Sequence, residues 1–292
     1  MKLMRHILAT LLLSASLLCG CNASNKPDED LHFEGAGKAT ELKVISYNIR
    51  LSTGNDGSNS WQYRKQASVK MINTEQPTLI GFQEMLSDQW SYLLESLPEY
   101  KMIGVGRDDG AKAGEYMAIF YRPDKVELLQ WGTFWLSETP DKPSMGWDAS
   151  YKRTCTWATF RSLATDTTFA HFNTHLDHQG AVAQREGLRL VVSKIKELIP
   201  ADMPVFLTGD FNIPTDNEAF AALEGELSDA RKTSPESDQR ATYNAWGGRE
   251  ATIDHIFYRK ATPYIFKVLR TENYGAPYIS DHYPVSFIAT IK

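Results

Sequence analysis

Short apolar runs alternate with amphipathic segments along most of the chain. The run VFL at 205–207, apolar at every position, predicts a strand that is buried on both faces. The segment 181–199 spaces its apolar residues three and four positions apart, which predicts an amphipathic helix. The expected strands are 42–50, 77–84, 100–105, 115–121, 126–130, 153–163, 167–177, one from 205, 251–258, 264–270 and 284–291. The other expected elements are helices at 61–76, 86–97 and near 216–224, a long aromatic loop at 131–152 and a loop-rich stretch at 228–250.

These strands and helices fall into two similar runs, one in each half of the chain. Such a pattern indicates two sheets packed face to face with helices outside them, an α/β sandwich. The 292 residues are enough for one large core or at most two small ones. The 13 Tyr, 13 Phe and 7 Trp are a generous supply of aromatic side chains for packing between two sheets.

The N-terminal segment has a different character from the rest. Lys2 and Arg5 precede an apolar run, 7–18, that is short for a membrane span, and small residues follow, as in an export signal. The tetrapeptide LCGC at 18–21 resembles the lipobox of bacterial lipoproteins. That resemblance implies cleavage before Cys21 and attachment of lipid to this residue.

We therefore expect a signal peptide at 1–20, a polar flexible tether at 21–40 and a folded domain at 41–292. A plain secretory signal or an uncleaved anchor is the alternative. Cys155 would be the one cysteine in the domain, so no intrachain disulfide is expected. A lipid on Cys21 would hold the protein to a bacterial membrane in the cell envelope, facing the periplasm or the cell surface.

Polar side chains end several of the apolar strands. Asp210 and Asn212 follow the run at 205–207 and lie two positions apart, so they share a face if the strand continues. The same feature recurs at Asn48, Glu84, Asn173, His175, Asp177, Asp254, Asp281 and His282. One such residue is commonly a turn cap, but an unpaired buried charge is costly. Many independent cases are better explained if these side chains meet and share a cation.

The residue types indicate which cation this would be. Carboxylate and amide oxygens with few nitrogens favour Mg²⁺, with Mn²⁺ or Ca²⁺ as alternatives. The sequence has no HExxH zinc motif, no GxxxxGK[ST] phosphate loop and no GxSxG nucleophile motif. A hard cation beside histidines and acids points to phosphoester hydrolysis. The net charge of −5 argues against a general nucleic-acid coat protein, but not against an enzyme that meets phosphate through a metal and a few Arg.

Seven short motifs occur in an order that resembles the endonuclease/exonuclease/phosphatase superfamily. They are SYNIR, GFQE, EYMAIFYRPDKV, NTHLD, GDFN, IDHIF and SDHYPV, and they span most of residues 41–292. The superfamily includes pancreatic-type deoxyribonuclease, apurinic endonucleases, deadenylases, inositol-phosphate phosphatases and bacterial sphingomyelinases. The resemblance implies a deoxyribonuclease-like, four-layer α/β sandwich of two mainly antiparallel sheets flanked by helices.

The resemblance also implies roles for individual residues. Glu84 resembles the family's principal metal ligand, with Asn48 beside it and Asp281 completing the metal side. Asp210 resembles the acid that positions or deprotonates the attacking water. Asn212 resembles the neighbour that holds a phosphate oxygen.

Two histidines complete the implied site. His282 resembles the histidine that contacts the scissile phosphate, oriented by Asp254. His175 resembles a second histidine of the deoxyribonuclease branch, where the orienting acid aligns with Glu115. Arg153 lies where that branch places an Arg on phosphate. A carboxylate behind an imidazole supports its cationic form, so two proton-handling pairs are expected.

Several of these residues also have simpler interpretations. Asn48 could bond only to neighbouring backbone, and His175 could be a core histidine. Glu115 and Arg153 could form a surface ion pair.

For other polar and aromatic residues the sequence indicates less specific roles. Asp177 either supports the site or closes a turn, and Tyr116 is a candidate phosphate contact. Packing roles are expected for His171, His178, His255, Trp131, Trp135 and Trp147, with a ligand platform as the alternative for the tryptophans.

The sequence thus predicts an exported, lipid-anchored, divalent-metal-dependent phosphoester hydrolase in which water attacks phosphorus in line. A phosphodiesterase or nuclease-like activity is the first interpretation, since the YRPDKV stretch at 121–126 is deoxyribonuclease-like. A phosphomonoesterase for sugar or inositol phosphates is the alternative, and a non-catalytic surface binder of phosphorylated ligands is the alternative of another class. A monomer without an obligate protein partner is expected.

Overall fold

The structure is a computed structural model that describes residues 39–270 and 274–292. The predicted signal peptide, the lipidation of Cys21 and nearly all of the predicted tether lie outside the described residues. The first strand begins at Thr40, one residue before the expected start of the domain. No helix within the described ranges is long and apolar enough to span a membrane.

One sheet has seven strands in the order β10-β12-β13-β1-β2-β4-β3. β1 lies between antiparallel β13 and parallel β2, and the remaining neighbours are antiparallel except β10 and β12. The strands are β1 (Thr40–Asn48), β2 (Leu79–Gln83), β3 (Lys101–Ile103), β4 (Ile119–Tyr121), β10 (Glu236–Ser237), β12 (Thr262–Val268) and β13 (Val285–Ile291).

The second sheet has six strands in the order β5-β6-β7-β8-β11-β9. Its neighbours are antiparallel except β7 and β8, which run parallel. The strands are β5 (Val126–Trp135), β6 (Thr154–Ser162), β7 (Thr168–His175), β8 (Val205–Asp210), β9 (Ser228–Asp229) and β11 (Asp254–Arg259).

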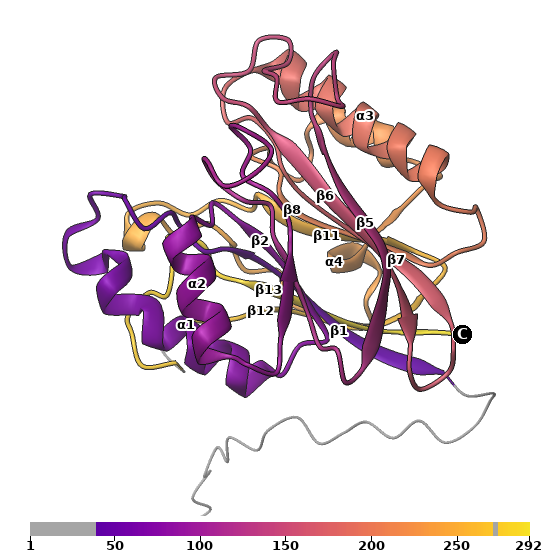
Figure 1. Ribbon diagram of the computed structural model, residues 1–292, viewed down its shortest axis with the longest axis horizontal. Helices are drawn as coiled ribbons and strands as arrows, with labels where there is room; N and C mark the ends of the chain where they lie inside the picture. Colours follow the sequence, from indigo (N-terminus) through magenta and orange to yellow (C-terminus); the bar gives the residue numbers. More distant parts are fainter. Residues whose placement is uncertain (1–38, 271–273) are drawn as a thin grey trace, which may run out of the picture. The chain divides into compact units, whose positions relative to one another are not determined.

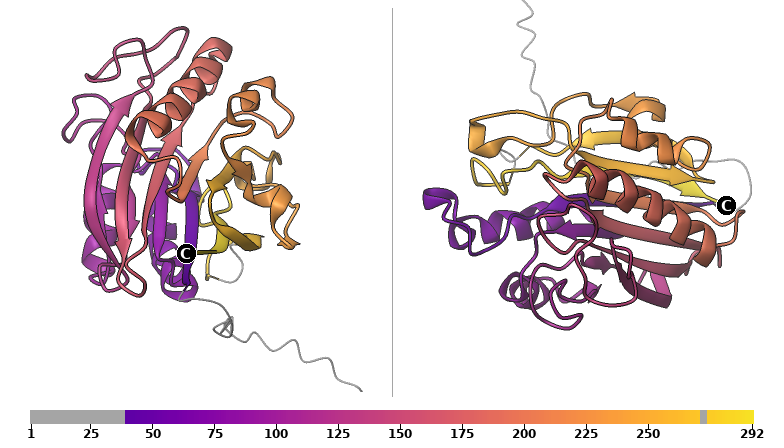
Figure 2. Two further views of the ribbon diagram at one scale, coloured as in Figure 1. Left: turned by 90° about the vertical axis from the view of Figure 1, so that its right-hand side faces the viewer. Right: turned by 90° about the horizontal axis from the view of Figure 1, so that it is seen from above.

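Helices cover the outer faces of the two sheets (Figure 1; Figure 2). α1 and α2 pack against the first sheet, and α3 packs against the second. The helices are α1 (Trp61–Glu75), α2 (Ser87–Ser96), α3 (Ala181–Leu198), α4 (Ala230–Thr233) and the 3₁₀ turns Gly57–Asn59, Glu218–Leu223 and Ala245–Gly247. The expected four-layer α/β sandwich of mainly antiparallel sheets is confirmed.

β1 shows why a buried strand carries apolar side chains on both of its faces. Leu42 and Val44 point into the core between the two sheets, where they join Phe160 and Phe206 of the other sheet. Ile45 and its neighbours on the opposite face pack under α1 and α2. Where both faces of the strand are covered, apolar side chains lie on both of them.

Two expectations about local structure are wrong. The stretch 131–135, expected in a loop, continues β5 as far as Trp135 and pairs with β6. β5 is an edge strand and half exposed, so its apolar pattern is weak. The helix expected near 216–224 is a 3₁₀ turn at Glu218–Leu223.

Candidate active site

Strand register brings three predicted residues into one row at the end of the second sheet. His175 ends β7 and pairs in register with Asp210, which ends β8. Asp210 in turn pairs with Asp254, which begins β11. In adjacent strands, residues in register point to the same side, so the three side chains lie next to one another.

The first sheet delivers the remaining polar strand ends to the same place. Asn48 ends β1, and its Nδ2 donates to Glu84 Oε1 at 3.0 Å and to Asp210 Oδ2 at 2.9 Å. The Asn48 carboxamide therefore joins a carboxylate of one sheet to a carboxylate of the other. Its Oδ1 accepts from the Arg50 backbone N–H at 3.0 Å. The alternative that Asn48 bonds only to neighbouring backbone is therefore wrong.

His282 forms the expected pair with Asp254. Its Nδ1 lies 2.9 Å and 3.1 Å from the two carboxylate oxygens, and the ring is buried. Burial alone would lower the pKa of His282, but the charges of Asp254 and Asp210 outweigh it and hold this pKa well above the ordinary value. Nδ1 therefore donates to Asp254, and the raised pKa favours the imidazolium form of His282.

His175 is in a different state, which its hydrogen bonds define. Its Nε2 lies 2.9 Å from Asn212 Nδ2, an atom that can only donate, so Nε2 is the acceptor and Nδ1 carries the proton. Nδ1 has no hydrogen-bond partner within the described part of the chain, and Glu115 Oε2 is 4.0 Å away. Burial, followed by the charges of Arg153 and Arg107, holds the pKa of His175 well below the ordinary value. The ring is a neutral imidazole.

The predicted orientation of His175 by Glu115 would need a hydrogen bond donated by Nδ1 to the Glu115 carboxylate, and this bond is not formed. Glu115 Oε2 accepts from Arg107 Nη1 at 2.7 Å instead. The surface ion pair between Glu115 and Arg153 is also wrong, because both side chains are buried and Arg153 Nε bonds to Asp177 Oδ1 at 3.2 Å. Burial and the neighbouring charge of Glu84 raise the pKa of Glu115 to about 7.

Asp210 occupies the centre of the site, between the two histidines. Its Oδ2 is 3.4 Å from His175 Nε2 and 3.7 Å from His282 Nε2. Its Oδ1 accepts from the Asn212 backbone N–H at 2.9 Å, in a turn where Asn212 has φ of 53°. Burial raises the pKa of Asp210 to about 7, against the opposing effect of His282.

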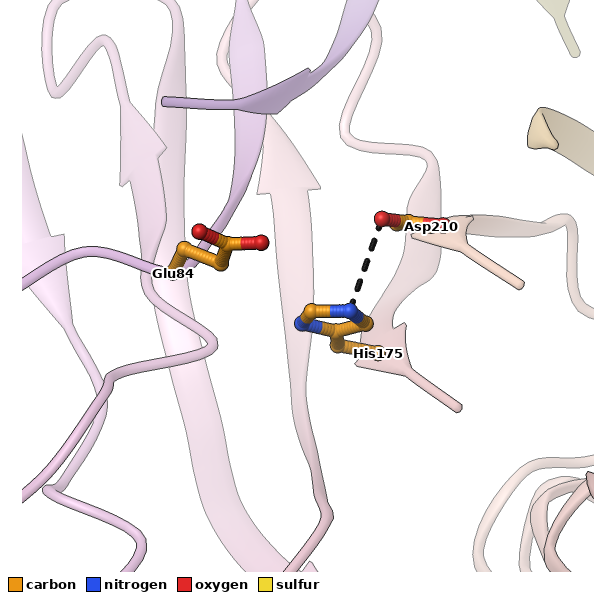
Figure 3. A group of neighbouring side chains, drawn as sticks. All are labelled: Glu84, His175 and Asp210. Carbon is orange, nitrogen blue, oxygen red and sulfur yellow. Dashed lines mark ion pairs between the residues drawn. The ribbon is translucent and has the colours of Figure 1, made fainter. Parts of the chain in front are cut away.

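The donor atoms suit a hard cation. Among the described residues, ligand atoms of Glu84, His175 and Asp210 lie within 4.8 Å of one another, and Figure 3 shows Glu84 facing the other two. The His175 Nε2 already accepts from Asn212, which leaves the carboxylates as oxygen ligands. Asp210, Asp254 and His282 form a second such group.

Arg50 is a fixed cation beside two of the predicted metal ligands. Its guanidinium lies 3.6 Å from Glu84 Oε2 and 3.9 Å from Asp281 Oδ2, and it pairs with Asp56. Its backbone is held at φ of 57°, and its carbonyl accepts from Arg64 Nη2 at 2.7 Å. Burial raises the pKa of Asp281. Arg50 offsets part of the carboxylate charge at this side of the site.

Other residues named from the sequence lie outside the centre. Tyr116 packs on Trp90, and Trp135 is buried, with its Nε1 donating to the Arg107 carbonyl. His255 packs among Phe211, Phe220 and Phe257. These side chains have the packing roles that were expected for His255 and Trp135.

Asp177 is more than a turn residue. Its Oδ2 accepts from the backbone of Gln179 and Gly180, while its Oδ1 holds Arg153. His178 also contacts Arg153, through Nδ1 at 3.2 Å from Nη2. Asp177 therefore both closes a turn and supports a site residue.

Sequence reasoning missed three residues at the site. Arg50 lies two positions after Asn48 in SYNIR, so its place in a motif could have identified it. Arg107 binds Glu115 from a loop, and Tyr243 packs on the His282 ring at 4.9 Å between centroids. No pattern in the sequence distinguishes Arg107 or Tyr243 from surface residues.

A sequence model of the Endonuclease/Exonuclease/phosphatase family matches residues 45–282. The chain belongs to this family. Members of the Endonuclease/Exonuclease/phosphatase family hydrolyse phosphoester bonds, in agreement with the chemistry predicted from the polar strand ends. The family is generally dependent on a divalent metal.

Solved structures of Bacteroides proteins are similar over the whole domain. A mannosyl-6-phosphatase of Bacteroides thetaiotaomicron is 38% identical, with a TM-score of 0.80, covering 86% of this chain and 100% of its own. An endonuclease/exonuclease/phosphatase from Bacteroides vulgatus is 36% identical, with a TM-score of 0.82, covering 87% and 100%. An uncharacterized protein of Acanthamoeba polyphaga mimivirus is 26% identical, covering 85% of this chain and 99% of its own.

Proposed function

We propose that this family member is a divalent-metal-dependent phosphomonoesterase that hydrolyses sugar phosphates. The observation that carries the choice of substrate is the 38% identity, over 86% of the chain, to a mannosyl-6-phosphatase. The site offers groups that suit the hydrolysis of a phosphoester: clustered carboxylates and two imidazoles in different environments. The similarity supports a sugar monoester among the family's substrates.

The stretch that favoured a phosphodiesterase lies away from the site. β4 is antiparallel to β2, so that Tyr121 pairs with Leu79 and Ile119 with Gly81. Glu84 follows the opposite end of β2, where the site is. The YRPDKV segment, 121–126, therefore begins at the remote end of the sheet and carries no preference for a diester.

Glu84 and Asp281 would hold the divalent ion, with Asn48 and Arg50 orienting the Glu84 carboxylate. When bound, the ion supplies Lewis-acid polarisation of a phosphoryl oxygen. Its expected identity is Mg²⁺, because the available donors are carboxylates.

Asp210 orients the attacking water and accepts its proton. The raised pKa of this carboxyl, about 7, makes it a base matched to neutral pH. A base whose conjugate acid has a pKa near the pH of the medium transfers protons efficiently in both directions.

His282 is the positively charged member of the two histidines. Its imidazolium, fixed by Asp254, can donate from Nε2 to a phosphoryl oxygen as negative charge develops there. His175 is neutral and is held by Asn212, so it can orient a phosphate oxygen through hydrogen bonding without adding charge. Arg153 is buried and donates to Asp177.

The same proposal covers location. The lipobox-like LCGC at 18–21 and the charged, apolar segment before it support export and a lipid on Cys21. A membrane-bound phosphatase would release phosphate and sugar outside the cytoplasm. Replacement of Cys21 by Ala should move the protein from the membrane fraction to the soluble fraction, and unchanged membrane association would contradict lipid anchoring.

A substrate panel tests the activity. The purified domain is assayed with mannose 6-phosphate, an inositol phosphate and bis(p-nitrophenyl) phosphate, in Mg²⁺, Mn²⁺ or Ca²⁺ and after chelation. We expect ion-dependent release of phosphate from mannose 6-phosphate. Turnover of the diester alone would establish a phosphodiesterase, and binding without any turnover would establish a non-catalytic binder.

Glu84→Gln identifies the ion site. We expect this variant to lose affinity for Mg²⁺ in calorimetry as well as activity. Asp124→Asn, a change at an exposed carboxylate paired with Arg122 at the remote end of the sheet, is the matched control. Equal Mg²⁺ affinity in the Glu84 variant and the wild type would remove Glu84 from the ligand set.

A further inference from the structure

Tyr151 is an aromatic side chain that is exposed but held in place from several sides. Its relative exposure is 53%. The ring stacks on His178, with 5.7 Å between centroids and 21° between planes. The guanidinium carbons of Arg107 and Arg153 lie 5.3 Å and 5.8 Å from its centroid. Single exposed aromatics are common on protein surfaces, but few are fixed by three such contacts.

These contacts connect Tyr151 to the site. Arg107 binds Glu115 at 2.7 Å, and Glu115 Oε2 is 4.0 Å from His175 Nδ1. Arg153 and His178 also contact each other, and His178 lies three residues after His175. Tyr151 is therefore an exposed aromatic side chain that is connected to His175 through Arg107 and Glu115.

The two guanidinium groups that contact the Tyr151 ring are each paired with a carboxylate. Arg107 is paired with Glu115, and Arg153 is paired with Asp177. The cations therefore serve to fix the ring more than to attract a second anion. What Tyr151 offers a ligand is the exposed part of its ring, whose π-electron face is negative and favours partially positive C–H groups.

We propose that Tyr151 is a substrate-binding residue on which the pyranose ring of the leaving-group sugar stacks. The proposal rests on the proposed function and deepens it, because it names the part of the substrate that this surface recognises. The axial C–H groups of a pyranose present a flat, weakly positive face that matches the face of a tyrosine. A nucleobase would also stack on an aromatic ring, but the net charge of −5 and the paired guanidinium groups disfavour a polynucleotide.

The test compares a ring substrate with an acyclic one. Steady-state kinetics with mannose 6-phosphate and glycerol 3-phosphate are measured for the wild type, Tyr151→Ala and Tyr151→Phe. We expect Tyr151→Ala to raise KM for mannose 6-phosphate about tenfold, the size of one lost aromatic contact, with little change in kcat. Its kcat/KM for glycerol 3-phosphate should stay within about twofold of the wild type, since this substrate has no ring to stack. Tyr151→Phe keeps the ring and should behave as the wild type.

Tyr63→Ala is the matched control, because Tyr63 is 65% exposed on α1. We expect no change in either substrate's kinetics for this variant. Equal losses on both substrates, or none, in Tyr151→Ala would overturn the stacking role while leaving the phosphatase proposal intact. A wild type that cleaves bis(p-nitrophenyl) phosphate but no sugar phosphate would overturn both. A selective loss on a dinucleotide would assign the ring to a nucleobase and overturn the sugar.

Discussion

The two histidines of the site are equally buried, but their pKa values are shifted in opposite directions. Each is 4% exposed, and each lies within 4 Å of Asp210. His282 also contacts Asp254 at 2.9 Å, and its pKa is well above the ordinary value. His175 accepts from Asn212 and has the cations Arg153 and Arg107 near it, and its pKa is well below the ordinary value.

This difference shows that, at equal burial, a carboxylate partner decides whether an imidazole is charged. Desolvation lowers both pKa values, but only His282 has a carboxylate in hydrogen-bond contact to reverse that effect. On the His175 side, the carboxylate of Glu115 is engaged by Arg107 and stays 4.0 Å away. The site therefore holds one cationic and one neutral imidazole on either side of a single carboxylate.

The largest effect is expected at Asp210, the carboxylate that both histidines share. Asp210→Asn should lower kcat by about 10³-fold, because the amide cannot accept a proton from water. The melting temperature should not fall, since the change removes a buried carboxyl that desolvation disfavours. Steady-state kinetics and circular dichroism measure the two quantities, with Asp124→Asn as the exposed control. Retention of activity within about twofold would refute the proposed base, because general-base catalysis typically contributes at least a hundredfold.

The next largest effect is expected at Asp254, the carboxylate that distinguishes His282 from His175. Asp254→Asn removes the charge that supports the His282 imidazolium and should lower kcat about a hundredfold. If the two residues act as one unit, His282→Asn and the double variant should lose no more than about twice as much as Asp254→Asn alone. Multiplicative losses in the double variant would show that Asp254 and His282 act independently.

A third histidine, His255, provides the case with no charged partner in contact. Both ring nitrogens lack a hydrogen-bond partner within the described residues, and burial lowers the pKa of His255 from 6.5 to about 3. Protons then bind the unfolded chain below pH 6.5 but not the folded one until about pH 3, so acid favours unfolding in this window.

His255→Leu should remove that acid sensitivity. Relative to the wild type, the variant's free energy of unfolding should improve by about 2 kcal/mol on going from pH 7.5 to pH 5, at 1.36 kcal/mol per pKa unit. Urea unfolding at the two pH values measures it. A difference between the proteins that does not change with pH would mean that His255 titrates normally in the folded state.

The smallest effect is expected at Arg107, and it tests why the pKa of His175 is lower than that of His282. Arg107→Gln removes a cation near His175 and frees Glu115 to approach Nδ1, so the pKa of His175 should rise toward its ordinary value. The change in kcat at pH 8 should be no more than about threefold, because the neutral ring is still the main form there. Nuclear magnetic resonance titration of His175 measures the shift. Arg161→Gln, which breaks an exposed pair with Glu127, is the control. An unchanged His175 pKa would mean that desolvation alone keeps the ring neutral.

Much of this arrangement could be predicted from local patterns. The continuous apolar run at 205–207 predicted a strand covered on both faces, and β8 is such a strand. Polar residues at the ends of strands predicted a shared site, and Asn48 does bridge Glu84 and Asp210. The edge strand β5 was predicted too short, since a strand half exposed to solvent has little apolar signal.

The amino-acid sequence by itself determined the strand pattern, the family and the set of acids, amides and imidazoles that meet at one sheet end. These follow from side-chain periodicity and motif order, which are local properties of the chain. Only the tertiary structure decided that Asp254 charges His282, that Arg107 draws Glu115 away from His175 and that Tyr151 lies over two guanidinium groups. Such pairings depend on ångström-scale distances between segments that are far apart in the sequence. The direction of a pKa shift depends on whether a carboxylate or a cation lies within hydrogen-bond distance of the ring.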